Sequence, residues 1–82
     1  MRLDDFLSTV GVIKRRTEAK EMCQNGLVEV NGHKAKPAHK ILPNDIIRIK
    51  GSSPQAIEVL NLPSGSVSKE TRTNYIKDLT VE

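Results

Sequence analysis

Cysteine and long apolar runs are scarce in this sequence, and each shortage excludes a class of protein. Cys23 is the only cysteine among 82 residues, so an internal disulfide is impossible and a zinc cluster is not expected. No apolar run approaches the roughly 20 residues of a membrane-spanning helix, and acids at positions 4 and 5 are unlike a secretion signal. We therefore expect a cytoplasmic protein, in a reducing setting, without a membrane partner, a metal or a cofactor.

Aromatic side chains are also few, since Phe6 and Tyr75 are the only ones. Phe6 belongs to an apolar helix stripe, and Tyr75 lies near the end of the chain. Proteins that bind single-stranded RNA rely on exposed aromatic side chains on which the bases stack. An RNA partner of this chain should therefore be structured RNA, recognised through its backbone and its shape.

Groupings of catalytic residues are missing as well. The sequence has no glycine-rich phosphate loop, no metal-ligand spacing and no set of a nucleophile with its base. Asp4 and Asp5 are neighbours on a predicted helix, where adjacent side chains point about 100° apart, a poor arrangement for paired-carboxylate chemistry. We expect no enzymatic activity and assign no catalytic residue.

Positive charge is what the chain does have, and it is concentrated. The whole chain has a net charge of +3. Residues 1–50 hold ten cations and six acids, a net charge of +4, whereas residues 51–82 hold three cations and four acids, a net charge of −1. Within residues 14–40 seven cations face three acids. One part of the molecule is therefore electropositive, which suggests a polyanionic partner.

Two short helices are predicted before residue 26. Leu3, Phe6, Leu7 and Val10 recur at three- and four-residue spacing, as on the apolar stripe of a helix, and Gly11 can end it. A second helix should begin within residues 15–17, directly behind three consecutive cations. Its first-turn N–H groups beside arginine side chains would make an anion-binding corner.

A hairpin should follow the second helix. Residues 27–30 alternate as a strand, and Asn31-Gly32 is the strongest short signal for a type I′ turn, because both central residues need positive φ. The return strand, residues 33–36, carries Lys34 and Lys36 at alternate positions, so that both can project from one face.

The remaining residues predict two more strands and a short helix. After Ile41 and Leu42, which are expected to pack, strands are predicted at 46–50 and 55–60. A loop is expected at 51–54, and Ser68 could N-cap a short helix to about residue 74, before a late apolar anchor at Tyr75-Ile76. The predicted fold class is α+β in one domain. Two short N-terminal helices pack on a small, mostly antiparallel sheet of about four strands, with residues 1–50 as the core and 51–82 as an extension.

Cations around the helix and the hairpin are the candidate RNA-binding residues. Arginine suits phosphate because its planar fork makes two parallel hydrogen bonds. The candidates, with one histidine among them, are Arg2, Lys14, Arg15, Arg16, Lys20, Lys34, Lys36, His39 and Lys40.

Each candidate also has a simpler interpretation. The charge run could be an ordinary solvated surface, and Arg2 could be a surface residue paired with Asp5. His33 and His39 could stack on bases, but solvated turn residues are the simpler interpretation. Cys23, on the apolar face of the second helix, is expected to be a core thiol.

The order of these features resembles the S4 RNA-binding domain, also called the αL motif. A helix, a basic corner and a VNG hairpin follow one another within residues 1–50. The residues that carry the resemblance are Arg2-Leu3-Asp4, Phe6-Leu7, Arg15-Arg16, Ala19, Gly26, Val28, Val30-Asn31-Gly32, Lys36-Pro37 and Asp45-Ile46-Ile47. Arg15 departs from the pattern, since many members have a helix-capping serine there, and the departure adds charge.

Within that family, the start at MRLD and the run IKRRTEAKE look like the RqcP branch, which is related to the bacterial fifteen-kilodalton heat-shock protein. This resemblance implies binding to the large ribosomal subunit that carries a peptidyl-tRNA after ribosome splitting, through large-subunit rRNA and tRNA. There the protein would support template-free tailing of the stalled nascent chain by an RqcH-type factor. We expect it to act as a monomer.

Two other functions remain open from the residues alone. One is a generic module that binds structured RNA or assists ribosome assembly. The other is the detached targeting domain of an RNA-modifying enzyme, since pseudouridine synthases and tyrosyl-tRNA synthetases carry similar domains. The short length, with no catalytic domain attached, argues against the second.

Overall fold

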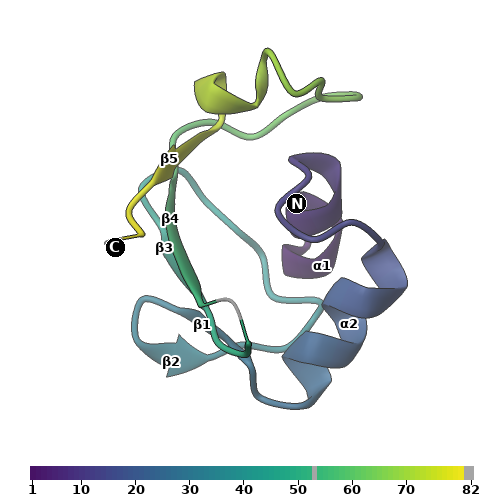
Figure 1. The fold of residues 1–82 in the computed structure, drawn as a ribbon, viewed down its shortest axis with the longest axis vertical. Helices are drawn as coiled ribbons and strands as arrows, with labels where there is room; N and C mark the ends of the chain where they lie inside the picture. Colours follow the sequence, from purple (N-terminus) through teal and green to yellow (C-terminus); the bar gives the residue numbers. More distant parts are fainter. Residues whose placement is uncertain (53, 81–82) are drawn as a thin grey trace.

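The computed structural model describes residues 1–52 and 54–80. Ser53, within the loop expected at 51–54, and residues 81–82 lie outside the described part. Figure 1 shows two helices on one side of a twisted sheet. The sheet has five strands in the order β2-β1-β3-β4-β5, and every neighbouring pair is antiparallel. The predicted α+β fold is confirmed.

Both predicted helices form, and glycines follow them. Helix α1 spans Leu3–Thr9 and α2 spans Arg16–Gln24. Gly11 and Gly26 have φ angles of +78° and +73°, a conformation that L side chains rarely adopt and that turns the chain away from a helix end. The turn at Gly11 leads the chain from α1 toward α2, and the turn at Gly26 leads it from α2 into the first strand of the sheet.

The hairpin forms with the predicted turn. Strand β1 spans Val28–Val30 and β2 spans His33–Lys34. Val30 pairs with His33, so the turn has two residues, and Asn31 and Gly32 have φ angles of +53° and +85° as type I′ requires. The return strand ends at Lys34, two residues earlier than predicted.

Asn31 also ties the hairpin to the third strand, a role that its place in the turn does not reveal. Strand β3 spans Ile46–Ile49. The Asn31 side-chain oxygen accepts a hydrogen bond from the Ile46 N–H at 2.9 Å, and the side-chain amide donates to Asp45 at 3.1 Å. The turn therefore connects β1 to β2 and also helps to fix the register of β3 against the hairpin.

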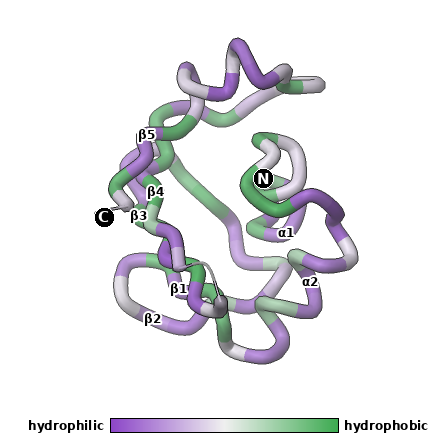
Figure 2. Tube along the Cα trace, in the orientation of Figure 1, coloured by the Kyte–Doolittle hydropathy of each residue, from purple (hydrophilic) through white to green (hydrophobic). Residues whose placement is uncertain are grey.

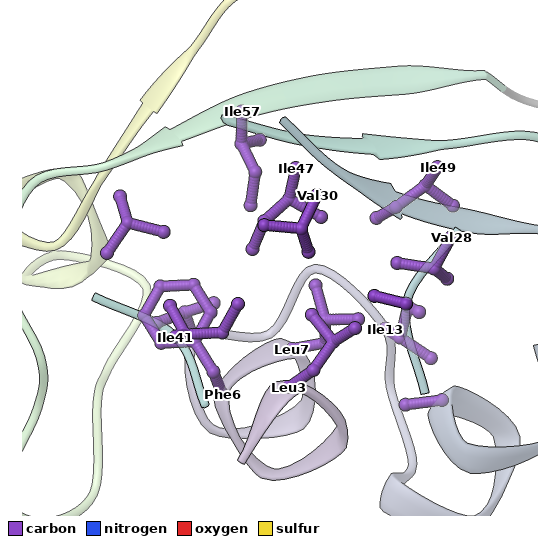
Figure 3. Close-up of a cluster of buried hydrophobic side chains, with 14 of the residues drawn as sticks. Leu3, Phe6, Leu7, Ile13, Val28, Val30, Ile41, Ile47, Ile49 and Ile57 are labelled. Atoms are coloured by element: carbon purple, nitrogen blue, oxygen red, sulfur yellow. The ribbon is translucent and has the colours of Figure 1, made fainter. Parts of the chain in front are cut away.

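The core lies between α1 and the inner face of the sheet. Leu3, Phe6 and Leu7 from α1 face Ile47 and Ile57 from the strands (Figure 3), and all five are at most 2% exposed. Full burial of each such side chain stabilises the fold by about 1.5–3 kcal/mol relative to exposure. This packing holds α1 on the sheet and leaves its N-terminal end beside α2.

The chain after β3 differs from the prediction in two elements. Strand β4 spans Gln55–Val59 as expected, but β5, Ile76–Asp78, adds a fifth strand. The short helix expected at 68–74 is wrong, since only a single 3₁₀ turn forms at Arg72–Asn74. Ser68 and Thr71 accept hydrogen bonds from each other's backbone N–H groups at 3.3 and 3.1 Å, the reciprocal pattern of a helix N-cap, but the chain does not continue as an α-helix.

The segment that links β2 to β3 also departs in part from prediction. Ile41 is fully buried, as expected, but Leu42 is 62% exposed. Leu42 begins a turn in which its N–H donates to the Asp45 carboxylate at 2.9 Å, and this turn directs its side chain outward. None of the helices within residues 1–52 and 54–80 is long and apolar enough to cross a membrane.

Candidate nucleic-acid interface

The first residues pair with a segment almost forty positions away, and this pairing begins the site. Arg2 forms an antiparallel bridge with Lys40. The Leu3 N–H donates to the His39 carbonyl at 2.8 Å, and the Ile41 N–H donates to the Met1 carbonyl at 2.8 Å. The cations around residue 40 therefore lie beside the N-terminal end of α1.

Asp4 is the electrostatic centre of the site. Its carboxylate is 1% exposed and accepts two parallel hydrogen bonds from Arg2, from Nε at 3.1 Å and from Nη2 at 3.2 Å. Arg16 Nε lies 3.7 Å from the same carboxylate. The alternative pairing of Arg2 with Asp5 is wrong, because Asp5 points elsewhere and accepts a hydrogen bond from the Thr9 hydroxyl at 3.4 Å.

Helix α2 begins at this point, with arginines at its start. Arg15 is the N-cap residue, in an extended conformation, and its side chain makes no capping hydrogen bond within the described part of the chain. The first-turn N–H groups of α2 thus lie next to Arg15 and Arg16, and Figure 2 shows hydrophilic residues where the connection from α1 enters α2. The helix begins within the predicted residues 15–17, and anion binding at this corner stays a prediction.

Two shallow hollows connect these residues to further lysines. Arg2, Asp4, Arg16, Thr17 and Lys20 line one hollow. Arg2 and Lys20 also line the next, which extends to Lys36 and has a floor of Cys23, Gln24, Pro37 and Ala38. We call the four cations Arg2, Arg16, Lys20 and Lys36 the basic corner. They come from three separate segments and line these two hollows, which share Arg2 and Lys20 and which we call together the depression.

The other candidate residues have different positions. Lys14 and Arg15 are exposed on the connection before α2, and His39 and Lys40 are exposed on the segment that pairs with Arg2. Lys14 and Arg15 directly precede Arg16 in the chain, and His39 and Lys40 lie on the segment that bridges Arg2. All four are therefore near the basic corner.

Lys34 lies apart from this group. Its side chain crosses Gly26 and reaches within 3.4 Å of the position that a Cβ there would take. Gly26 follows the C-terminal end of α2, while Arg16 begins the helix, and nine residues of helix span roughly 14 Å. The prediction that Lys34 and Lys36 project together gains no support, since Lys36 lines the depression and Lys34 does not.

The outer face of the sheet, defined by Glu29, Lys34, Arg48, Glu58 and Lys77, carries its own charges. Register places Glu29 between Lys34 and Arg48, and Glu58 opposite Lys77. Glu29 also accepts a hydrogen bond from Lys50 Nζ at 2.6 Å. Lys50 and the nearby cations hold the pKa of Glu29 below its ordinary value. Acids and bases therefore alternate here.

Cys23 is a core thiol, as predicted. Its side chain is buried, and desolvation, followed by the negative charge of Asp4, raises its pKa to about 11. A thiol with this pKa stays protonated near neutral pH and is a poor nucleophile.

The role of Asp4 is what sequence reasoning missed. The sequence places Asp4 and Asp5 together in the first turn of α1, where either could complement the helix dipole. Only the packing of α1 against α2 shows that Asp4 faces Arg16 whereas Asp5 does not. The one available signal is the Arg2-Leu3-Asp4 triplet. Asp4 is close enough in the chain to accept a hydrogen bond from Arg2, the N-cap residue of α1.

Comparison with known proteins identifies the family of this chain. The S4 domain family matches residues 1–47, more than half of the chain. The chain is 38% identical over 76 residues to the RQC P-site tRNA stabilizing factor of Halalkalibacterium halodurans, covering 92% of this chain and 86% of that protein. It is 34% identical over 62 residues to the uncharacterized RNA pseudouridine synthase YlyB of Bacillus subtilis, but this match covers 20% of that protein.

The fold is similar to that of Heat Shock Protein 15 from Vibrio cholerae, whose structure is trimeric. The TM-score is 0.87 at 23% identity, over 95% of this chain and 80% of that one. This likeness shows the shared fold. The relative that is matched along most of its length is named as a stabilizing factor and not as an enzyme. The basic corner lies within the matched residues, and the chain belongs to the S4 domain family, in the branch of the RQC P-site tRNA stabilizing factors.

Proposed function

We propose that this protein binds a tRNA on the large ribosomal subunit and stabilises it there during ribosome-associated quality control. The basic corner is the observation that carries the proposal. Four cations from three segments line two hollows that share Arg2 and Lys20, and all four lie within the residues that match the S4 domain. A relative of similar length is named as a P-site tRNA stabilizing factor in the same process.

The chemistry of the basic corner suits phosphates rather than bases. Arginine forks and lysine ammonium groups bind phosphate oxygens, and the start of α2 adds backbone N–H donors. Phe6 is fully buried and Tyr75 is partly buried, so neither supplies an open stacking surface. Phosphates of a folded RNA, such as the junction between a bound tRNA and large-subunit rRNA, fit this surface.

The wider assignments follow from this role. Large-subunit rRNA beside the tRNA is the proposed second contact, and an RqcH-type tailing factor is the proposed protein partner. The protein would act in the cytoplasm. It would act as a monomer, because one chain supplies the whole basic corner. The near-neutral residues 51–82 would be free to face a protein neighbour.

Recovery of bound particles tests the proposal. Tagged protein should recover large subunits that carry peptidyl-tRNA, with few intact ribosomes, and sequencing of the recovered RNA should be dominated by tRNA and large-subunit rRNA. An Arg48→Gln variant, altered on the outer face, should recover the same particles. Recovery of messenger RNA, or of small-subunit precursors alone, would overturn the quality-control role and leave general RNA binding in its place.

A further inference from the structure

Asp4 is the only charged residue in the described part of the chain that is buried. A buried carboxylate is costly unless its oxygens are paired. Both oxygens have partners here, since Oδ1 accepts from Arg2 Nε at 3.1 Å and from the Asp5 N–H at 2.8 Å, and Oδ2 accepts from Arg2 Nη2 at 3.2 Å. Arg16 adds its charge at 3.7 Å.

The position of Asp4 makes it a junction between three segments. Its side chain reaches from α1 to the first residue of α2, and its own N–H donates to the Pro37 carbonyl at 3.1 Å. The two arginines remain accessible, because their side chains are 47% and 54% exposed. Each guanidinium has five N–H donors, so contact with Asp4 leaves other donors directed toward solvent.

We propose that Asp4 is a positioning residue for RNA binding, holding the Arg2 and Arg16 guanidinium groups in place so that this negative charge strengthens the binding of a polyanion. The inference rests on the proposed function, since the bound polyanion is RNA at the basic corner. It gives Asp4 a role distinct from helix capping and from simple neutralisation of nearby charge.

Two physical effects predict opposite results when the Asp4 charge is removed. Simple electrostatics predicts tighter RNA binding, because the net charge rises from +3 to +4 and a group that repels phosphate is lost. Positioning predicts weaker binding, because two long side chains would have to be ordered when RNA binds. The sign of the change therefore distinguishes the two effects.

The test is RNA affinity of Asp4→Asn against a matched control. Asparagine has nearly the same shape and retains an oxygen acceptor. Asp5→Asn makes the same change in net charge one residue away, at a carboxylate that contacts Thr9 and no arginine in the described part of the chain. Asp4→Asn should bind tRNA-bearing large subunits about tenfold more weakly, equivalent to about 1.4 kcal/mol. Asp5→Asn should bind as tightly as wild type or slightly more tightly.

A second background separates positioning from general damage to the fold. When Arg2→Gln and Arg16→Gln are both present, Asp4 has no guanidinium left to hold. Adding Asp4→Asn to that double variant should then cause no further loss of affinity. A further tenfold loss in that background would show that Asp4 acts on the fold and not through the two arginines.

A measurement on the wild-type protein keeps the proposal testable if Asp4→Asn does not fold. In NMR relaxation spectra, the Nε–H groups of Arg2 and Arg16 should be more rigid than that of Arg15, whose side chain is exposed and forms no ion pair with a carboxylate in residues 1–52 or 54–80. Equal mobility of the three groups would overturn the proposal.

The outcomes separate this inference from the proposed function. If wild-type protein does not bind the RNA, the proposed function fails. If wild type binds and Asp4→Asn binds as tightly as Asp5→Asn, the positioning role fails while the proposed function stands.

Discussion

The helix side of the molecule and the outer face of the sheet both carry lysines and arginines, but they arrange acids among them differently. At the basic corner the central carboxylate, Asp4, is buried beneath two arginines. On the outer face Glu29 lies between Lys34 and Arg48 of the neighbouring strands, and Glu58 lies opposite Lys77. A phosphate approaching the first region meets cations, whereas one approaching the second meets both signs.

This difference shows why charge counts are a poor guide to a binding surface. The outer-face cations Lys34, Arg48 and Lys77 have the same side-chain types as the basic corner, and cross-strand pairing makes them part of a stabilising network. At the basic corner the carboxylate neutralises part of the charge but leaves the two guanidinium groups about half exposed. Position relative to acids, and not the number of cations, separates the two regions.

The largest effect is expected from an arginine substitution at the basic corner, with an arginine of the outer face as its control. Arg16→Gln should weaken binding to tRNA-bearing large subunits by about 1–3 kcal/mol, because a charge-assisted contact to phosphate is lost. Its melting temperature should change little, because the contact with Asp4 is long and partly exposed. Arg48→Gln should weaken binding by less than about 0.5 kcal/mol. Equal losses in titrations of the two variants would erase the distinction between the regions.

The hairpin turn should affect stability and spare binding. Gly32→Val should lower the free energy of unfolding by about 1–3 kcal/mol, because valine would be forced to a positive φ. The position has open space for a side chain, so the cost is backbone strain and not a clash. Gly65→Val, also in open space, is the control and should change stability by less than about 0.5 kcal/mol. An unchanged denaturation midpoint for Gly32→Val would contradict the type I′ turn.

Two lysines can be compared through the salt dependence of binding. Lys20→Gln should reduce the slope of log K against log salt by about 0.7–0.9, the contribution of one neutralised phosphate. Lys34→Gln should leave the slope unchanged, because Lys34 lies beside Gly26 and Glu29, away from the depression. A reduced slope for Lys34→Gln would extend the RNA-binding surface to the far end of α2.

The smallest effect is expected from the outer-face ion pair. The hydrogen bond from Lys50 holds the folded-state pKa of Glu29 below its ordinary value of 4.5. This contribution to stability is therefore present above the unfolded-state pKa and is lost as pH falls through the folded-state pKa. Thermal unfolding should be measured from about pH 7 to about pH 3. The melting temperature of wild type should exceed that of Lys50→Gln at neutral pH, and the difference should vanish in acid. A difference that is constant with pH would exclude the ion pair as its source.

Local sequence signals predict the elements of this fold well where they are strong. The apolar stripe of α1, the Asn31-Gly32 turn and the alternation of β4 each act within a few residues, and each appears as expected. The helix expected after Ser68 does not form beyond a 3₁₀ turn at Arg72–Asn74, although the Ser68 hydroxyl accepts the capping hydrogen bond from the Thr71 N–H. Strand β5 depends on pairing with β4, a contact that its three residues do not signal.

The candidate site is predicted less completely, because its geometry comes from contacts between distant segments. The sequence identifies Arg2, Arg16, Lys20 and Lys36 as cations but does not separate them from Lys34. Their grouping depends on the bridge between Arg2 and Lys40 and on the direction of Asp4 toward α2. Residues that a local pattern treats alike are thus separated by tertiary packing.

Photo-crosslinking from two matched threonines tests the central claim most directly. Thr17 lines the depression with Arg2, Arg16 and Lys20, whereas Thr80 lies beside Arg48 on the outer side of the sheet. With a photo-crosslinking side chain at either position and large subunits that carry peptidyl-tRNA, position 17 should crosslink to tRNA or adjoining large-subunit rRNA, and position 80 should not. RNA crosslinks from position 80 without any from position 17 would contradict the account.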